Sequence, residues 1–418
     1  MIETTNEKER LIMIMAANCD DWEAESNLTE LALLIETGGN EAIAELIQKR
    51  EAAHPLHYLG KGKLDELKAL VEQTGADAVA ADDELTASQR IAMEKALGVR
   101  VLDRTLIILD IFAKRASTAE GKVQVELAQL RHRLSHLTGL GTSLSRLGGG
   151  IGTRGPGEKK LETDRRHIRR RISQLNIELK DIMTRNSLLR DNRNRTGLPV
   201  ISIVGYTNAG KSTLMNALTG ASVLTEDKLF ATLDTTTRVI SLPGGSEALC
   251  VDTVGFIKKL PHHLVQAFRA TLDELRYSDI LLHVVDAANS DRENQMKVVY
   301  KTLDILGCNG KPLITVFNKA DLTVSYPLPT DAAASCNVHV SALTGENICL
   351  LLDQINIILQ DVRKKTTLLI PFSESRWIRR IHEHCEIISE DHMAEGTLIT
   401  AYMDNTLAGR LHEYSVNR

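Results

Sequence analysis

The 418-residue sequence has few prolines, and it lacks any long apolar run. Nine prolines and 27 glycines exclude a collagen-like or low-complexity chain, and 43% apolar residues exclude a wholly disordered one. The longest apolar stretches, residues 11–17 and 106–113, are far shorter than the ~20 residues that a membrane-spanning helix needs. Acidic and basic residues are mixed near the start of the chain, which argues against a secretory signal. We expect a cytoplasmic protein without a membrane span.

Cysteine is also scarce, and the six cysteines lie singly without any C-x-x-C spacing. Disulfide frameworks and zinc ribbons need closely spaced pairs, so this pattern favours small buried thiols. We expect a monomer.

The net charge of −5 hides a strong asymmetry along the chain. Residues 1–51 carry twelve acidic and four basic residues. Residues 139–171 carry nine basic residues and three acidic ones, a net charge of +6. A local basic segment on an acidic chain predicts one surface that binds a polyanion.

Alternating apolar runs and helical stretches predict a small N-terminal α/β domain over residues 1–117. We expect strands at 78–81 and 99–102. Helices are expected at 40–50, 63–72 and 86–97.

Two heptad seams follow, separated by a glycine-rich stretch at residues 139–157. They predict an antiparallel coiled-coil hairpin over 118–196, with a glycine-rich basic tip at 148–157. An α/β unit with the size of one domain is expected over 197–364 and a small α+β domain over 365–418. The fold class is therefore multidomain α/β. The last domain is expected to contain a strand, a helix, two strands around Gly396 and a short helix.

A phosphate-binding loop follows the apolar run at 200–204. It has the pattern G-x-x-x-x-G-K-[ST] between a predicted strand and a predicted helix. Its glycines allow close backbone approach to phosphate, Lys211 offers a charge to the β- and γ-phosphates, and the Ser212 hydroxyl suits Mg²⁺. The loop consists of Gly205, Tyr206, Thr207, Asn208, Ala209, Gly210, Lys211 and Ser212.

Three further motifs extend the predicted nucleotide site, and the aspartate of the second one selects GTP. Asp252 ends a strand and is placed to hold Mg²⁺ through water, while the N–H of Gly255 can reach a γ-phosphate. Asp321 can accept hydrogen bonds from N1–H and the 2-amino group of guanine, which adenine lacks as a pair. The motifs are Asp252-Thr253-Val254-Gly255, Asn318-Lys319-Ala320-Asp321 and Ser341-Ala342-Leu343, the last of which suits contact with the guanine O6.

In these motifs the region resembles a translation-factor-type GTPase domain. The resemblance points to Phe230-Ala231-Thr232-Leu233-Asp234 as the first switch, with Thr232 ligating Mg²⁺ beside Ser212. Thr235, Thr236 and Thr237 are alternatives for that role. Lys211, Thr232 and Gly255 are the expected catalytic residues. Phe256 stands where Ras-like GTPases have a glutamine that orients water, so we expect slow intrinsic hydrolysis.

Long motifs across nearly the whole chain resemble the HflX family of ribosome-associated GTPases. The motifs are YLGKGK at 58–63, VLDRT at 101–105, LDIFA at 109–113, GKVQVELA at 121–128, GGGIGTRGPGE at 148–158, FATLD at 230–234 and DTVGF at 252–256. Thr235 departs from the family, which usually has proline there. The resemblance implies binding of GTP and GDP with Mg²⁺, binding to the large ribosomal subunit and its RNA, and splitting of stalled ribosomes. Any contact with membranes would then be peripheral, through ribosomes.

Two other functions share part of this pattern. One is a GTPase of tRNA modification or ribosome assembly, although one such family ends in a cysteine motif and this chain has no cysteine after Cys385. The other is a nucleotide-gated scaffold without a role in RNA binding.

Overall fold

A computed structural model describes residues 8–147, 156–194, 198–220, 229–230, 236–259, 273–322 and 328–416. Their contacts divide the chain into two compact units. The first is Met1–Lys180 with Asp227–Leu233 and Lys258–Phe268, and the second is Asp181–Glu226, Asp234–Ile257 and Arg269–Arg418. No described helix is long and apolar enough to cross a membrane.

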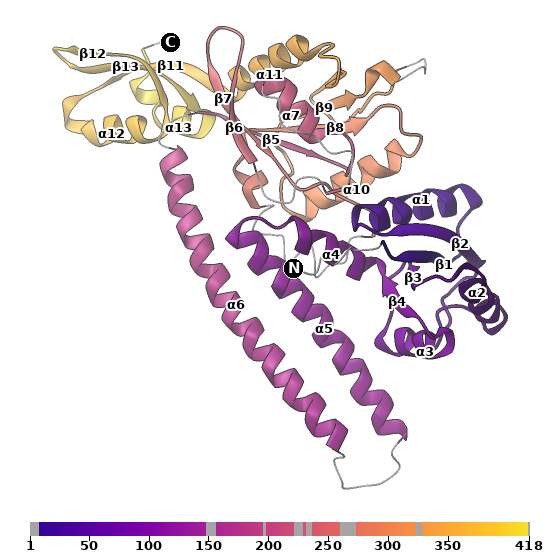
Figure 1. Ribbon diagram of the computed structural model, residues 1–418. Helices are drawn as coiled ribbons and strands as arrows, with labels where there is room; N and C mark the ends of the chain where they lie inside the picture. The colour runs from indigo at the N-terminus through magenta and orange to yellow at the C-terminus, as the bar shows by residue number, and fades with distance from the viewer. Residues whose placement is uncertain are drawn as a thin grey trace, which may run out of the picture. The chain divides into compact units, whose positions relative to one another are not determined.

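The first unit begins with a four-stranded parallel sheet in the order β2-β1-β3-β4 (Figure 1). Its strands are β1 (Arg10–Ala17), β2 (Glu41–Lys49), β3 (Ala78–Ala81) and β4 (Arg100–Asp103). Its helices are α1 (Asp21–Thr37), α2 (Lys61–Thr74), α3 (Ala87–Leu97) and α4 (Arg104–Arg115).

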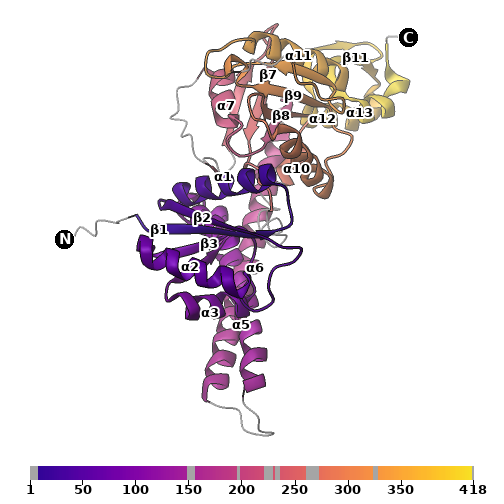
Figure 2. The same cartoon turned by 90° about the vertical axis from the view of Figure 1, so that its right-hand side faces the viewer.

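Helices cover both faces of this sheet, with α1 on one side and α2 and α3 on the other (Figure 2). Ile12 and Ile14 of β1 pack in one core with Leu67 of α2 and Met93 of α3. The alternate residues of β1 are also buried, which is the pattern of a parallel sheet covered on both faces. The expected N-terminal α/β fold is present.

The prediction of a helix at 40–50 was wrong. Its sequence is rich in helix formers, yet the segment forms β2. It pairs along its whole length with β1, which is the central apolar strand of the sheet. Tertiary pairing therefore overrides local propensity here. The expected helices at 63–72 and 86–97 and the strands at 78–81 and 99–102 are present within one or two residues at most ends.

Two long helices, α5 (Ala119–Leu147) and α6 (Pro156–Asn194), form the expected hairpin. Arg171 of α6 pairs with Glu126 near the start of α5, and Arg165 of α6 donates to the Leu137 carbonyl further along α5 (2.6 Å). The first turns of α5 are buried on more than the predicted seam, because α5 also packs against α3 and α4. Residues 148–155 of the predicted tip lie outside the described residues.

The second unit contains a six-stranded sheet in the order β10-β9-β8-β5-β7-β6, parallel except for the pair β6–β7. Its strands are β5 (Val200–Gly205), β6 (Thr236–Ser241), β7 (Glu247–Asp252), β8 (Ile280–Asp286), β9 (Leu313–Asn318) and β10 (Cys336–His339). Its main described helices are α7 (Lys211–Thr219), α10 (Arg292–Ile305) and α11 (Ile348–Val362). One apolar core joins β5, β8 and β9 to α7 and α11, so the carboxyl ends of the strands form a rigid edge.

The chain ends in an antiparallel sheet of order β11-β13-β12. The elements are β11 (Arg363–Ile370), α12 (Ser375–His384), β12 (Glu386–Met393), β13 (Gly396–Asp404) and α13 (Asn405–Arg410). This is the predicted order of strand, helix, two strands and helix. The segment has a core of its own around Leu368, Ile381 and Ile399.

Candidate functional site

The predicted phosphate loop connects the end of β5 to the start of α7. Gly210 precedes α7 in the left-handed region, with φ of 89°, and Asn208 also has a positive φ of 61°. Glycine and asparagine are the residues that adopt this conformation most readily. The turn therefore leaves the first N–H groups of α7 unpaired by the helix itself, which suits an anion.

Two glycines of the loop also lack room for a side chain. A Cβ on Gly205 would lie 2.3 Å from the carbonyl oxygen of Val284 on β8, and one on Gly210 would lie 2.2 Å from Nδ2 of Asn318. Such distances are far inside van der Waals contact, so any larger residue would displace β8 or Asn318. The two positions fix the loop against neighbouring strands.

Lys211 begins α7 and is only 7% exposed. Its Nζ donates to the carbonyl oxygen of Tyr206 (2.8 Å) within the same loop. Burial lowers the pKa of Lys211 to about 8, although the Asp252 carboxylate opposes the shift. A buried ammonium gains from a polyphosphate, because the negative charge of the ligand compensates for the lost solvation.

Asp252 ends β7 beside the loop, and its Oδ2 accepts from the Ser212 hydroxyl (2.9 Å). A hydroxyl and a carboxylate are the hard oxygen donors that Mg²⁺ prefers, so these two residues fit the cation. Thr253 next to it donates to the Ile203 carbonyl of β5 (2.7 Å) and thereby fixes the start of the segment.

Gly255 and Phe256 follow directly and lie against the phosphate loop. A Cβ on Gly255 would lie 2.8 Å from the Nζ of Lys211, so only glycine leaves this approach open. Phe256 pairs with the loop backbone, because its N–H donates to Gly205 (3.1 Å) and its carbonyl accepts from Thr207 (2.8 Å). The phenyl side chain is 3% exposed and cannot hold a water for attack.

Asn318 joins two of the predicted motifs. Its Nδ2 donates to the Ala209 carbonyl of the phosphate loop (2.9 Å), and its Oδ1 accepts from the N–H of Ala342 (3.0 Å). Asn318 is 2% exposed, so both bonds are sheltered from water. The Asn318 side chain thus fixes the distance between the phosphate loop (205–212) and the loop at 341–343, which is expected to contact guanine.

The remaining guanine-motif residues surround Asn318. Lys319 pairs with Asp286 at the end of β8 (2.7 Å), and the N–H of Ala320 donates to Val340 (3.0 Å). Ser341 is buried and accepts from the N–H of Thr344 (3.2 Å). Asp321 and Leu343 are exposed beside them. The residues at 205–212, 252–255, 318–321 and 341–343 therefore share one edge of the sheet, the expected location for a ligand.

The predicted first switch is described only in part. Phe230 is buried and packs edge-on against Phe112 of α4, with ring centroids 4.6 Å apart. The N–H of Leu229 donates to the Thr37 hydroxyl at the end of α1 (3.3 Å). Ala231, Thr232, Leu233, Asp234 and Thr235 lie outside the described residues.

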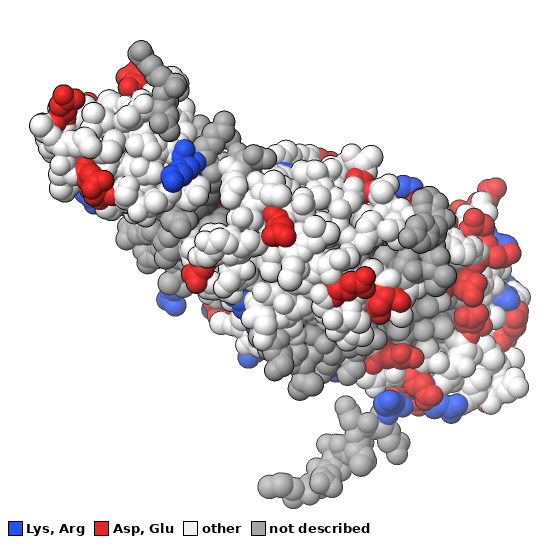
Figure 3. Space-filling view, turned by 90° about the horizontal axis from the view of Figure 1, so that it is seen from above, with Lys and Arg blue, Asp and Glu red and all other residues white. Residues whose placement is uncertain are grey.

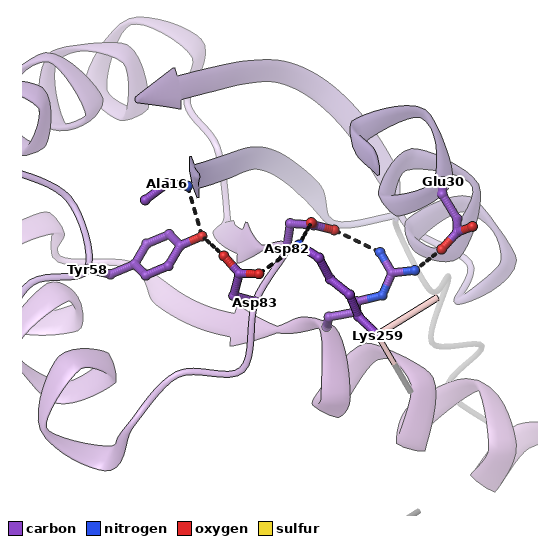
Figure 4. Close-up of polar contacts among 7 residues, drawn as sticks. Ala16, Glu30, Tyr58, Asp82, Asp83 and Lys259 are labelled. Atoms are coloured by element: carbon purple, nitrogen blue, oxygen red, sulfur yellow. Dashed lines mark hydrogen bonds and ion pairs between the residues drawn. The ribbon is translucent and has the colours of Figure 1, made fainter. Parts of the chain in front are cut away.

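A cluster that the motifs did not predict holds the segment after Phe256. Lys259 donates to Asp82 (2.5 Å) and to Asp83 (2.7 Å), which follow β3 (Figure 4). Tyr58 donates to Asp83 (2.6 Å) and accepts from the N–H of Ala16 (2.9 Å). The sequence signals available were the adjacent acids at 82–83 after a buried strand and the tyrosine of the YLGKGK motif.

The same cluster extends to Arg104, which pairs with Asp82 (2.7 Å) and with Glu30 (Figure 4). Asp82 is fully buried, and this burial raises its pKa to about 6 although Lys259 opposes the shift. The buried carboxylate of Asp82 lies between two cations. Removing either cation would destabilise the fold, because the negative charge of Asp82 would then be poorly compensated. Asp82 and Asp83, which follow β3, thus hold the chain at Lys259, three residues after Phe256.

Comparisons with known proteins cover nearly the whole chain. Residues 25–113 match the family model described as GTP-binding GTPase N-terminal, residues 115–193 match GTP-binding GTPase Middle Region, and residues 200–319 match 50S ribosome-binding GTPase. The chain is 48% identical over 411 residues to GTPase HflX of Lacrimispora saccharolytica, covering 98% of this chain and 97% of that protein. The chain belongs to the HflX family of GTPases.

A relative from another organism agrees with this assignment. GTPase HflX of Escherichia coli is 41% identical over 372 residues, which is 88% of this chain and 87% of that protein. Among solved structures, a GTP-binding protein from Sulfolobus solfataricus in complex with GDP is 26% identical, with a TM-score of 0.45 over 84% of this chain and 98% of that one. This HflX-family member is a P-loop GTPase, as its sequence predicted.

Proposed function

We propose that this HflX-family GTPase binds GTP with Mg²⁺ at the edge described above and uses its hydrolysis to dissociate from ribosomes that it has split into subunits. The observation that carries the nucleotide part is Asn318, whose two hydrogen bonds fix the phosphate loop and the 341–343 loop in one site. The family model described as 50S ribosome-binding GTPase supports the large subunit as partner.

In this proposal each residue at the edge has a defined task. The N–H groups of the phosphate loop and the ammonium of Lys211 hold the β- and γ-phosphates, and Gly255 offers its N–H to the γ-phosphate. Ser212 and Thr232 ligate Mg²⁺, with Asp252 holding it through water, and the cation neutralises charge that develops on the phosphates. Asp321 accepts from guanine, while Ala342 and its neighbours approach O6.

Phe256 leaves the hydrolysis step without the glutamine that positions water in Ras-like GTPases. Phe256 occupies the place of the glutamine, its backbone is bonded to the phosphate loop, and its side chain is buried. A displaced segment or a partner must then complete the site, which makes the ribosome the expected activator.

The hairpin α5–α6 is the proposed RNA-binding arm. Arg165 and Arg171 are used within the hairpin, since they bond to Leu137 and Glu126. Arg169 and Arg170 are exposed, and no ion pair holds either of them among the described residues. These two arginines are therefore available for RNA phosphates.

The opposite charge on α1 argues against the N-terminal sheet as the RNA-binding face. Acidic side chains gather over part of the surface in Figure 3. On α1 and at its N-cap the exposed acids are Asp20, Asp21, Glu23, Glu25 and Glu36. Phosphates would be repelled there, so the arm is the better candidate.

Ribosome-stimulated hydrolysis is the main test of this proposal. Purified protein is expected to hydrolyse GTP slowly and to be accelerated by large subunits, because Phe256 cannot orient water. Phosphate release with and without 50S particles measures this. Co-sedimentation with ribosomes in the presence of a non-hydrolysable GTP analogue separates the alternatives. A tRNA-modifying GTPase would bind tRNA in preference to ribosomes, and a scaffold would bind neither ribosomes nor tRNA. Fast turnover that ribosomes leave unchanged would contradict the proposal.

The arm can be tested by charge reversal. Arg169→Glu with Arg170→Glu should weaken binding to ribosomes and reduce the slope of log affinity against log salt by about 1.4, at ~0.7 for each lost phosphate contact. Deletion of 148–157 should have a similar effect on splitting. The matched control is Lys61→Glu with Lys68→Glu on α2, which makes the same charge change at exposed positions. All variants should keep wild-type GTP affinity. Splitting unchanged by both arm variants would remove the arm from this role.

A further inference from the structure

Three buried side chains meet where the N-terminal sheet joins α5. Asp103 ends β4 and caps α4, while His132 and His136 lie four residues apart on α5. The three are 0%, 3% and 7% exposed. Their ligand atoms lie within 4.8 Å of one another, and these are the one such His, Cys, Asp or Glu group found among the described residues.

The distances lie within about half an ångström of those in a zinc centre. The Nε2 atoms of His132 and His136 are 2.9 Å apart, and Nε2 of His132 lies 3.7 Å from Oδ2 of Asp103. Ligands about 2.0–2.1 Å from a tetrahedral Zn²⁺ are separated by roughly 3.3 Å, which falls between these two values. The spacing i, i+4 puts both imidazoles on one face of α5.

The surroundings orient the ligands. Asp103 Oδ1 accepts from the N–H of Leu106 (2.8 Å), and Oδ2 accepts from that of Leu85 (3.3 Å). Backbone donors of this kind fix a carboxylate in place for a cation. The same hydrogen bonds also stabilise the buried carboxylate of Asp103 when no metal is bound, so Asp103 alone is no evidence for a metal site.

The pair of histidines offers two nitrogen ligands at one point. Two Nε2 atoms at 2.9 Å form a hydrogen bond when one ring carries its proton there, and a metal ion would instead take both lone pairs. A cavity of about 390 Å³ borders both rings and is also lined by Arg90, Asp110 and Arg133. It provides an entry path and room for a water as fourth ligand.

We propose that Asp103, His132 and His136 bind a Zn²⁺ ion that fixes the base of the hairpin to the N-terminal sheet. Two imidazoles and one carboxylate suit Zn²⁺ better than Mg²⁺ or Ca²⁺, which favour oxygen ligands alone. The site joins residues of the N-terminal and middle segments of the chain, since Asp103 lies in the first and both histidines in the second. It is independent of the nucleotide site.

The test uses the full chain with GDP and Mg²⁺ in excess, so that the nucleotide site is filled. Zn²⁺ is titrated against a chelator of known affinity, and metal content is measured by mass spectrometry after dialysis. The wild type should bind about one ion per chain, and His136→Gln should weaken the affinity by more than ~100-fold, since even partners of ligands cost 10–100-fold. The control is His167→Gln, an exposed histidine on α6 that should bind like the wild type.

A second variant guards against a simple loss of folding. Asp103→Asn keeps an oxygen to cap α4, because asparagine is also a favoured N-cap, but it removes the charged ligand. Added Zn²⁺ should raise the thermal midpoint of the wild type and of His167→Gln, and should leave both site variants unchanged. Absence of Zn²⁺ binding by the wild type, or equal binding by His136→Gln and Asp103→Asn, would overturn the proposal.

Discussion

Replacing Lys211 with alanine is expected to lower the affinity for GTP and the rate of hydrolysis by about a hundredfold or more. The ammonium is the one buried cation of the phosphate loop, and no backbone group replaces its charge. Because burial lowers its pKa to about 8, the free protein loses this charge as the pH rises past 8. GTP affinity of the wild type should therefore fall above pH 8, and this fall should be absent from the variant. Calorimetric titration across pH 6.5–9.5 measures both effects.

Folding and binding can be separated in this variant. A lysine whose pKa is lower in the folded state than its ordinary value of 10.5 costs folding stability below pH 8. Lys211→Ala should thus unfold at the same temperature as the wild type or higher. The control is Lys311→Ala, since Lys311 is also partly buried with a lowered pKa but bonds to Ser278, outside the loop. Normal GTP binding by Lys211→Ala would refute the assigned role.

The second large effect is expected from Asp321→Asn, which should exchange guanine for xanthine as the preferred base. The amide can accept from N1–H of xanthine and donate to its 2-oxo group, whereas it meets the guanine 2-amino group with a donor. Loss of a hydrogen bond to a charged acceptor costs about 1.5–3 kcal/mol, so GTP affinity should fall roughly tenfold to a hundredfold. Competition between GTP and XTP for a fluorescent nucleotide measures the exchange.

The matched control for this change is Asp304→Asn, an exposed aspartate near the end of α10. It makes the same change of charge away from the 318–321 loop and should keep the wild-type preference. Asp321 is exposed, so loss of folding is not expected to confuse the result. Unchanged guanine preference in Asp321→Asn would mean that another residue reads the base.

Local sequence patterns predicted which residues gather at the carboxyl edge of the second sheet, because binding phosphate and guanine requires particular residues at fixed spacings. Gly210 is one such position, since it needs both a positive φ and an absent side chain. The helix wrongly expected at 40–50 shows the limit: Ala, Glu, Leu and Gln favour helix, and only the partner strand β1 makes the segment β2. The secondary-structure propensity of a segment does not show which distant segment it will pair with.

The residues that sequence reasoning missed all depend on distant contacts. Asp82 and Lys259 are 177 positions apart, and neither stands in a motif that names the other. His132 and His136 have the spacing that places two side chains on one face of a helix, but the third proposed ligand, Asp103, belongs to another element. Only the fold brings Asp103 to them.

The hydrogen bonds of Lys259 to Asp82 and Asp83 limit how far Phe256 can move, because only two residues lie between Phe256 and Lys259. Three residues span at most about 11 Å when fully extended. Any rearrangement of Phe256 that accompanies loss of a phosphate therefore either pulls on the acidic pair or stays within that reach. By thermodynamic reciprocity, a change that loosens the acidic pair must alter the energetic gap between the GTP-bound and GDP-bound forms by the same amount that the nucleotide alters the pair. Any coupling between the acidic pair and the bound nucleotide therefore acts equally in both directions.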